Sequence, residues 1–305
     1  MPDITYESRP LSPFRLDFTV WALRRRAENA LDLWDAGTYR RLVIWNGKTI
    51  SMAVRQSPSE KPLLEINATG AMPEAELRAA ATATVNRILG LQIDLTPFYR
   101  LSGGDDKLKH LTEKFRGLKP PRFPTIFETL VNGISCQQIS LAAGIHLLNQ
   151  LAKRYGHSSD CWQRQCHAFP EPAALAKLQP EELRKLGFSR QKARAIIELA
   201  SSVDDGFDLE HLSAMGDDKV LKALYGLHGV GRWTAEYALL RGLGRLHIFP
   251  GDDVGARKKL RRVLGLSGNL DYNSVERILS SWAPYAGFIY FHLLLEELAE
   301  GGYLQ

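Results

Sequence analysis

The nine residues LHGVGRWTA at positions 227–235 decide the fold of this chain. They separate two stretches that we predict to be helices, residues 219–225 and 232–243. The glycines on either side of Val230 permit a tight turn and leave backbone N–H groups without intrahelical partners at the start of the second helix. Those donors and the helix macrodipole both favour an anion such as a phosphate. An ordinary helix–helix turn is the alternative interpretation, because glycine is common in such connections.

A pair of carboxylates follows downstream of this turn, in FPGDDV at positions 249–254. Asp253 stands just before a predicted helix, residues 255–264, where an aspartate caps free backbone N–H groups. Capping alone is one explanation of this residue. The other is catalytic, since a carboxylate held ionised at a helix N-terminus stabilises positive charge that develops during a reaction.

Together these two motifs resemble the helix-hairpin-helix DNA glycosylase superfamily. The family signature runs Leu, Pro, Gly, Val, Gly, Arg, a variable residue, Thr and Ala, and His228 stands here in place of the proline. The resemblance implies that Asp253 is the catalytic residue, with Asp252 as the one-residue alternative. In such enzymes the carboxylate stabilises the oxocarbenium-like sugar or orients the attacking water.

Position 233 distinguishes two reaction classes within that superfamily. Relatives that form a Schiff base and then cut the strand carry a lysine there, whereas this chain has Trp233. The resemblance therefore implies simple hydrolysis by a monofunctional enzyme. Tryptophan offers an electron-rich face on which a flipped base stacks. The helical spacing of Trp233, Tyr237 and Leu240 equally fits a buried helix face, so pocket and core both remain open.

The resemblance narrows to the 3-methyladenine DNA glycosylase II, or AlkA-type, family and covers almost the whole chain. Its other motifs are PPRFP at 120–124, ISCQQIS at 134–140, GFSRQKA at 187–193 and WAPY at 282–285. It implies that Gln138 fills the gap left by a flipped nucleotide; polar residues at a helix start are the alternative for Gln137 and Gln138. The implied substrate-binding residues are Trp233, Tyr237 and Tyr285, and the implied DNA-binding residues are Gln137, Gln138, Gly229, Gly231, Arg232 and Thr234.

The leading hypothesis is a monofunctional glycosylase that flips alkylated purines, such as 3-methyladenine and 7-methylguanine, out of duplex DNA in base excision repair. Alkylation makes these bases cationic and good leaving groups, so one carboxylate and aromatic walls suffice. One alternative is a glycosylase for oxidised or deaminated purines. Another is a non-catalytic helix-hairpin-helix protein that binds damaged DNA, for which Asp253 has no chemical use.

No cofactor is expected to be required. Three cysteines are too few for the four-cysteine iron–sulfur cluster that some relatives carry, and they suit a reducing compartment. The eight histidines show no metal-ligand spacing. The resemblance implies a structural Na⁺ or K⁺ on hairpin carbonyls, at residues such as Tyr225, Leu227 and Val230.

Charge and hydropathy indicate the partner and the location. A net charge of +5 suits double-stranded DNA containing damaged bases, and the chain shows no apolar run of membrane-spanning length and no signal peptide. We expect a monomer, cytoplasmic and nucleoid-associated if bacterial, nuclear if eukaryotic. The basic run 257–262 either neutralises phosphates or is solvated, and the roles of Arg122, Lys192 and Arg232 stay open in the same way.

The predicted fold class is α+β, with two domains. Residues 1–98 form a mixed domain with an antiparallel sheet, and residues 99–305 form an all-helical glycosylase body with the helix-hairpin-helix at about 218–242. In the first domain we expect strands at 14–20, 39–45, 48–55 and 63–69, with Asn46-Gly47 as a hairpin turn, and helices at 23–34 and 74–90. In the second we expect no strand and helices at 125–136, 139–155, 181–186, 190–202, 219–225, 232–243, 255–264 and 272–300.

Overall fold

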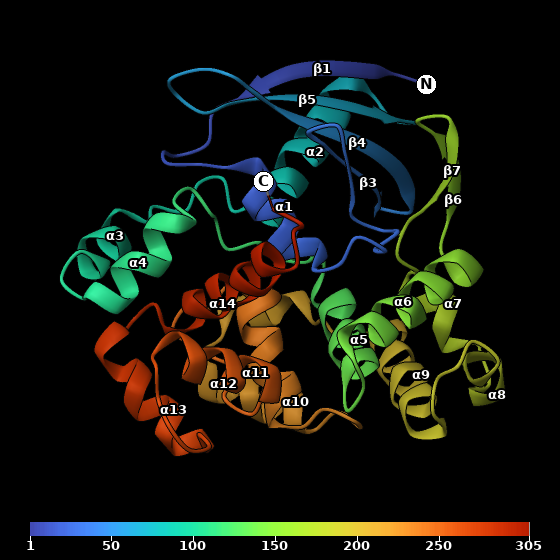
Figure 1. The fold of residues 1–305 in the computed structure, drawn as a ribbon. Helices are drawn as coiled ribbons and strands as arrows, with labels where there is room; N and C mark the ends of the chain where they lie inside the picture. Colours follow the sequence, from blue (N-terminus) through green and yellow to red (C-terminus); the bar gives the residue numbers. More distant parts are fainter. Residues whose placement is uncertain (305) are drawn as a thin grey trace.

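A five-stranded antiparallel sheet forms one layer of the N-terminal region in the computed structural model, which describes residues 1–304 (Figure 1). Its strands lie in the order β1-β5-β4-β3-β2. The bounds are β1 Asp3–Ser8, β2 Leu33–Asp35, β3 Thr38–Trp45, β4 Lys48–Ser57 and β5 Leu63–Gly70. The hairpin predicted at Asn46-Gly47 is confirmed, because both residues have positive φ, 48° and 71°, between β3 and β4.

Helix α2 (Glu74–Leu89) covers one face of this sheet (Figure 1). Alternate residues of β4, namely Ile50, Met52 and Val54, are buried in the same apolar cluster as Leu77 and Val85 of the helix. Apolar residues repeat every two positions on the strand and about every 3.6 positions on the helix, so each element presents one apolar face to the other. The predicted strands at 39–45, 48–55 and 63–69 and the predicted helix at 74–90 are therefore confirmed.

The prediction was wrong for residues 14–34. Leu16–Arg24 is a helix, α1, where a strand was expected, and the expected helix at 23–34 is a loop followed by β2. Nearly every residue of α1 is buried, because it lies between two apolar clusters: Val20 faces the sheet and Phe18 faces the C-terminal helices. A helix buried on both sides has no single polar face, so its pattern imitates an alternating strand. Strand β1 was not predicted at all.

The rest of the chain is built mainly of helices, and the predicted α+β fold class is confirmed. The elements are α3 (Thr96–Ser102), α4 (Asp106–Lys114), α5 (Ile126–Cys136), α6 (Leu141–Tyr155), α7 (Pro172–Ala176), α8 (Pro180–Arg184), α9 (Arg190–Asp204), α10 (Asp217–Tyr225), α11 (Arg232–Arg241), α12 (Val254–Val263), α13 (Tyr272–Leu279) and α14 (Ala286–Glu300), with 3₁₀ turns at Glu210–Ala214 and Ser280–Trp282. Helices α3, α4 and α7 were not predicted.

Two features of this helical region correct the prediction. The single helix expected at 272–300 is broken into α13, a 3₁₀ turn and α14, because Pro284 has no N–H to continue a helical ladder. A two-stranded hairpin, β6 (Ser158–Cys161) and β7 (Arg164–His167), stands where no strand was expected. Its turn uses Trp162 and Gln163 at positive φ, so the usual Asn-Gly or Asp-Gly signal is missing.

A buried ionic network joins the sheet to the helical region. The Arg41 guanidinium of β3 donates to both carboxylate oxygens of Glu128, in the first turn of α5, at 2.6 and 2.7 Å. It also donates to Asp32, which accepts from the Tyr39 hydroxyl as well. The Arg41 side chain is 1% exposed. Burial raises the pKa of the Glu128 carboxyl, and the nearby Arg41 charge opposes that rise.

A second buried arginine fixes the end of α1 against α11. Arg241 donates to the backbone oxygens of Ala22 and Leu23 at 2.9 and 3.1 Å. These carbonyls belong to the last turn of α1, after which no further helical turn supplies N–H groups to donate to them. The contact fixes the position at which the chain leaves α1, one residue before Arg25.

No single helix among residues 1–304 is long and apolar enough to cross a membrane. The stretches Tyr272–Trp282 and Ala286–Glu300 reach that length and composition only as a pair, and they are bent by 103° at the break.

Candidate active site

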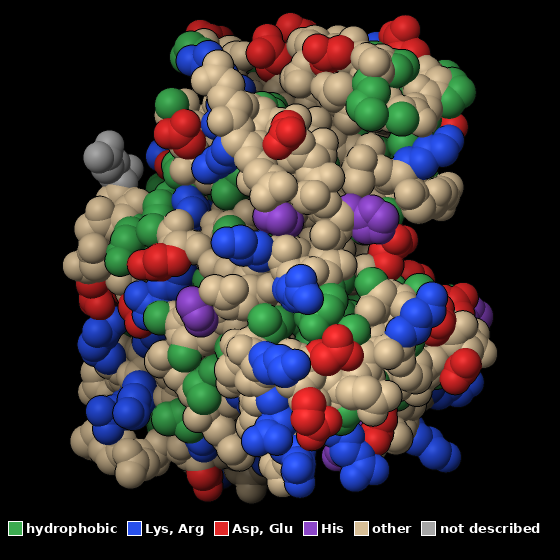
Figure 2. Space-filling view, turned by 90° about the vertical axis from the view of Figure 1, so that its right-hand side faces the viewer, with side chains coloured by type: hydrophobic (Ala, Val, Ile, Leu, Met, Phe, Trp, Pro, Cys, Tyr) green, Lys and Arg blue, Asp and Glu red, His purple; other side chains and the backbone are tan. Residues whose placement is uncertain are grey.

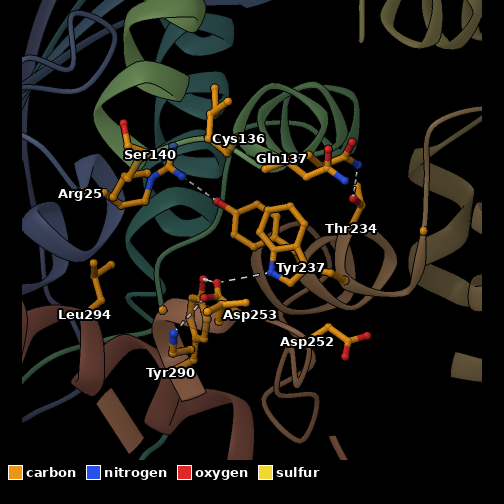
Figure 3. Close-up of a pocket in the computed structure, with 18 of the residues that line it drawn as sticks. Arg25, Cys136, Gln137, Ser140, Thr234, Tyr237, Asp252, Asp253, Tyr290 and Leu294 are labelled. Atoms are coloured by element: carbon orange, nitrogen blue, oxygen red, sulfur yellow. Dashed lines mark hydrogen bonds between the residues drawn. The ribbon is translucent and has the colours of Figure 1, made fainter. Parts of the chain in front are cut away.

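A cavity of about 1120 Å³ lies where four segments meet: the end of α5, the hairpin before α11, the start of α12 and the middle of α14. Figure 3 shows side chains from all four segments directed toward this space. The residues that line this cavity include Arg25, Gln138, Trp233, Tyr237, Asp253 and Tyr290. Residues distant in the sequence therefore share one site.

Asp253 is the N-cap of α12, as predicted, and it also faces the aromatic side of the cavity. Its Oδ1 accepts from the backbone N–H of Ala256 at 2.8 Å. Its Oδ2 accepts from the Tyr290 hydroxyl at 2.8 Å and from Trp233 Nε1 at 3.3 Å (Figure 3). Three donors therefore hold this carboxylate in one orientation.

Asp252 is engaged on a different side of the same loop. Its Oδ2 accepts from Arg232 Nε at 2.6 Å, and that guanidinium lies 3.9 Å from the centre of the Tyr272 ring. Figure 3 shows the Asp252 side chain pointing away from Tyr237. Of the two adjacent carboxylates, Asp253 is the one that contacts the aromatic side chains of the cavity.

Glu236, which the sequence analysis did not single out, binds the loop before α12 from its buried side. It is 6% exposed and accepts from the Gly251 N–H at 3.1 Å and from the Tyr272 hydroxyl at 2.6 Å. Burial raises the pKa of its carboxyl, while the two hydrogen bonds lower it. The only sequence signal is a charged residue on an otherwise apolar face of α11.

Trp233 and Tyr237 form a stacked pair on α11. Their ring centroids are 5.3 Å apart and the rings are inclined by 28°. Tyr237 is 2% exposed and Trp233 is partly buried, and both line the cavity while packing against the apolar cluster of the sheet domain. The two interpretations of these aromatics are thus both correct: they are core residues and cavity walls.

Tyr285 is not brought to the cavity with the other predicted residues. It precedes α14 and packs its ring against Phe98, with centroids 5.3 Å apart. The break at Pro284 restarts the helix, and the aromatic that reaches the cavity is Tyr290 instead. Tyr290 lies one turn further along α14, and burial together with the Asp253 charge raises its pKa well above the ordinary value. Its hydroxyl therefore stays protonated and donates to Asp253.

We expect the Tyr290→Phe substitution to lower the rate of any reaction in which the Asp253 carboxylate takes part by about tenfold to a hundredfold, because a hydrogen bond to a charged group contributes about 1.5–3 kcal/mol. The measurement is a single-turnover rate at saturating enzyme. The matched control is Tyr285→Phe on the same segment, which should leave the rate within about twofold. Equal losses in both variants would show that the effect comes from α14 packing and not from the Asp253 contact.

The loop between α5 and α6 presents three exposed residues, Gln138, Ile139 and Ser140. Gln137 donates through Nε2 to the Gly229 carbonyl and to Thr234 Oγ1, both at 2.8 Å, and Lys192 donates to the carbonyls of Ser135 and Gln137. Gln138 is exposed and has a φ of 55°, which is uncommon for a residue with a side chain. Gln137, Lys192 and the buried Thr234 side chain therefore support the loop, whereas Gln138 projects from it.

The hairpin has the geometry that its glycines predict. Gly229 has a φ of 78°, and a Cβ there would lie 2.5 Å from that of Ala195, so only glycine fits. Gly231 is the N-cap of α11 and has open space around it. Backbone N–H groups at this helix start are accessible to a phosphate.

Most of the basic side chains in residues 257–262 are bound within the protein. Lys259 pairs with Glu297 and Arg262 with Glu300. Arg257 and Arg261 donate to the carbonyls of Leu270 and Gly268. On a different face, the one on the α7 and α8 side of Figure 1, Figure 2 shows Lys and Arg side chains mixed with Asp and Glu. The run is therefore mainly a structural feature of α12.

Arg122 also has a structural place. Its Cδ lies 2.9 Å from the position of an added Cβ at Gly244, and its guanidinium donates weakly to the backbone oxygens of Arg87 and Leu243. Burial lowers the pKa of this group.

Residues 131–284 match the family model described as "HhH-GPD superfamily base excision DNA repair protein". The matched range contains the second half of α5, the hairpin, Asp253 and the segment up to Pro284. It leaves out the sheet domain and α14.

Three proteins illustrate the similarity. A DNA-3-methyladenine glycosylase of Bacillus subtilis is 31% identical over 204 residues, 67% of each chain. DNA-3-methyladenine glycosylase 2 of Escherichia coli is 29% identical over 182 residues, which are 59% of this chain and 61% of that protein. The solved structure of a 3-methyladenine DNA-glycosylase from Archaeoglobus fulgidus has a TM-score of 0.83 and 26% identity, covering 96% of this chain and 98% of the other.

Proposed function

Because this chain belongs to the HhH-GPD superfamily of base excision DNA repair proteins, we propose that it is a monofunctional DNA glycosylase that hydrolyses the N-glycosidic bond of alkylated purines, such as 3-methyladenine and 7-methylguanine. The observation that carries the proposal is the Asp253 carboxylate beside the stacked Trp233–Tyr237 pair. The proteins named above as 3-methyladenine glycosylases support the substrate class.

The proposed reaction begins when a damaged nucleotide leaves the stack and its base enters the cavity beside Trp233 and Tyr237. The bond between C1′ of the sugar and the base nitrogen breaks, and its electron pair goes to the base. An alkylated purine is already cationic and leaves as a neutral molecule, so it needs no acid. The ionised Asp253 stabilises the positive sugar, and a water then adds to C1′ and gives up its proton. The products are a free base and an intact strand with an abasic site.

Hydrolysis is favoured because the cavity offers no free lysine nucleophile in the described chain. Trp233 stands at the start of α11, where bifunctional relatives carry a lysine. Lys259 lines the cavity, but its ammonium group is paired with Glu297 at 2.5 Å. A Schiff base needs an amine that is free to attack the sugar, and the Lys259 amine is held against the Glu297 carboxylate instead.

Duplex DNA is the partner that suits the two exposed features beside the cavity. The N–H groups of the Gly229–Gly231 turn and the start of α11 suit a backbone phosphate. Gln138 projects next to the cavity and suits the role of filling the gap that the flipped nucleotide leaves.

A structural Na⁺ or K⁺ at the hairpin also fits the residues present. The carbonyl of Leu227 accepts from the Val230 N–H, which leaves it a free lone pair, and Tyr225 ends α10 at the same turn. Carbonyl oxygens are suitable ligands for such ions. The carbonyls of Tyr225, Leu227 and Val230 would hold the ion and thereby stiffen the turn that faces the phosphate.

The test is incubation of the protein with a duplex that contains one 7-methylguanine. We expect free base to appear, with strand breaks only after alkali and no enzyme–DNA adduct after borohydride. Breaks without alkali, or a trapped adduct, would mean that a lyase nucleophile is present. Absence of release from an entire panel of damaged bases, with binding retained, would support a non-catalytic DNA-binding protein.

A further inference from the structure

The segment that follows α1 brings two arginines to the cavity from outside the helix-hairpin-helix region, Arg25 and Arg26. Arg25 is 5% exposed and is bound inside the protein. Its Nη1 donates to the Tyr237 hydroxyl at 3.1 Å and its Nη2 to Asn132 Oδ1 at 2.6 Å. Arg25 therefore fixes this segment against α11 and α5.

Arg26 stands next to this fixed residue, but its own side chain is free. Its backbone N–H donates to the Arg24 carbonyl at 2.8 Å, whereas its guanidinium makes no hydrogen bond or ion pair with residues 1–304. Nε is buried without a partner, while Nη1 and Nη2 are not among the buried atoms. A guanidinium stays charged under all ordinary conditions. Arg26 thus presents exposed, charged N–H donors at the edge of the cavity.

The other cationic side chains that line the cavity in the described chain are already engaged. Arg232 and Lys259 each pair with an acidic residue that also lines the cavity. Arg25 has the two neutral partners given above. A partly buried cation without an acceptor carries an energetic cost, which a bound anion reduces. Arg26 is therefore the cavity cation that is available to a ligand.

The loop that carries Arg26 is held in place by neighbouring side chains. Asn149 of α6 accepts from the Ala30 N–H at 3.0 Å and donates to the Glu28 carbonyl at 2.7 Å. Asn29 accepts from two backbone N–H groups further along the loop, at 2.8 and 2.9 Å. A ligand that binds to a loop fixed in this way pays little entropy for ordering it.

Arg26 and the hairpin lie on different sides of the aromatic pair. Figure 3 shows Arg25 on one side of Tyr237 and Thr234, in the first turn of α11, on the other. Arg26 is the next residue after Arg25, so their Cα atoms are about 3.8 Å apart. A nucleotide whose base enters the cavity keeps a phosphate on each side of its sugar. The hairpin N–H groups suit the strand on one side of that nucleotide, and Arg26 suits it on the other.

We propose that Arg26 binds a backbone phosphate of the DNA strand whose nucleotide enters the cavity, so that the segment after α1 is part of the DNA-binding surface. The inference rests on the proposed glycosylase function. A guanidinium forms charge-assisted hydrogen bonds to phosphate oxygens and matches their geometry. With one contact on each side of the extruded nucleotide, the strand is held at two points while the base occupies the cavity.

The first experiment measures how the affinity for a duplex with one tetrahydrofuran abasic analogue depends on salt, by fluorescence anisotropy. This duplex has no base at the site, so a base contact cannot contribute. For Arg26→Met we expect the slope of log affinity against log salt to become shallower by about 1, the value for one phosphate contact. Affinity at about 0.1 M salt should fall about tenfold, and Arg26→Lys should restore the slope because it restores the charge.

The matched control is Arg55→Met. Arg55 is an exposed arginine of β4 that does not line the cavity, and its replacement removes the same charge from the protein. Its slope should equal that of the wild type, with affinity within about twofold, because salt screens a charge that is distant from the DNA. An equal change of slope in both variants would attribute the effect to net charge and overturn the contact.

A second experiment locates the phosphate. Each phosphate near the abasic analogue is replaced in turn by an uncharged methylphosphonate. At one position on the strand that carries the analogue, the replacement should weaken binding of the wild type about tenfold but that of Arg26→Met by less than about twofold. At all other positions the two proteins should respond alike.

The outcomes separate this inference from the function beneath it. A wild type that binds the abasic duplex, with the same slope and the same methylphosphonate profile as Arg26→Met, overturns the role of Arg26 and leaves the glycosylase intact. A wild type that binds neither this duplex nor one with 7-methylguanine overturns the proposed function, and the inference with it.

Discussion

Replacing Asp253 with asparagine is expected to lower the single-turnover rate of base release by about a thousandfold or more, because removing one preorganised electrostatic group from an active site has an effect of this order. Asparagine caps a helix about as well as aspartate. The bond from the Ala256 N–H to the side-chain oxygen therefore persists, and the melting temperature should hardly change. Affinity for duplex DNA should be retained or increased, since one negative charge near the phosphates is gone.

Asp252→Asn is the matched control for this experiment. It removes the same charge one residue away, where the carboxylate pairs with Arg232 near the surface. Exposed pairs of this kind contribute little, so its rate should stay within about fivefold of the wild type. An inactive Asp252→Asn beside an active Asp253→Asn would assign the chemistry to the neighbouring residue. Fluorescence anisotropy with an abasic duplex measures the affinity of both variants.

The largest expected change in stability comes from Arg41→Met. Loss of this guanidinium leaves Asp32 and Glu128 buried without a cation, and breaking a buried ion pair on one side costs about 3–5 kcal/mol. Urea unfolding measures the free energy. The control, Arg40→Met on the same strand, removes a partner of the exposed Asp35 at 3.6 Å and should cost less than about 1 kcal/mol.

The pH dependence of the Arg41→Met variant has a definite sign. Burial already raises the pKa of Glu128, and the Arg41 charge opposes that rise, so the variant should show a still higher pKa. A carboxyl whose pKa is higher in the folded protein binds protons more readily there, so stability increases as the pH falls. The difference from the wild type should therefore narrow as the pH falls from neutral towards the ordinary glutamate pKa of about 4.3. A widening difference would contradict the assignment of the loss to an unpaired carboxylate.

The sequence predicted the parts of the fold that have local signals. Asn46-Gly47 determined a hairpin through positive φ, and the spacing around Val230 determined the turn before α11. It failed for α1 because that helix is buried on two sides by elements that are distant in the sequence. It failed at Trp162-Gln163 because the turn there uses residues that seldom adopt its conformation. Local propensity cannot report such tertiary effects.

The residues of the candidate site likewise fall into those with a local sequence signal and those without one. Asp253, Trp233 and Tyr237 were found because they belong to contiguous motifs with a fixed spacing. Arg25 and Tyr290 were missed, although each makes a direct contact with one of those residues. Their contacts cross 212 and 37 positions of sequence, and no local pattern distinguishes either from an ordinary surface arginine or core tyrosine. The sequence pointed to Tyr285, but the helix restarts after Pro284 and the aromatic residue that lines the cavity is Tyr290.

The contact between Arg25 and Tyr237 has a consequence for how the protein is made. A ribosome releases Arg25 and the apolar face of α1 well before their partners, because Tyr237 on α11 follows Arg25 by 212 positions and α14 follows later still. Until then the surface of α1 that carries Phe18 and Trp21 is exposed on the nascent chain, which invites aggregation or chaperone binding. The sheet and α2 form earlier from neighbouring segments. The site is therefore completed in one late step, when α14 packs against α1.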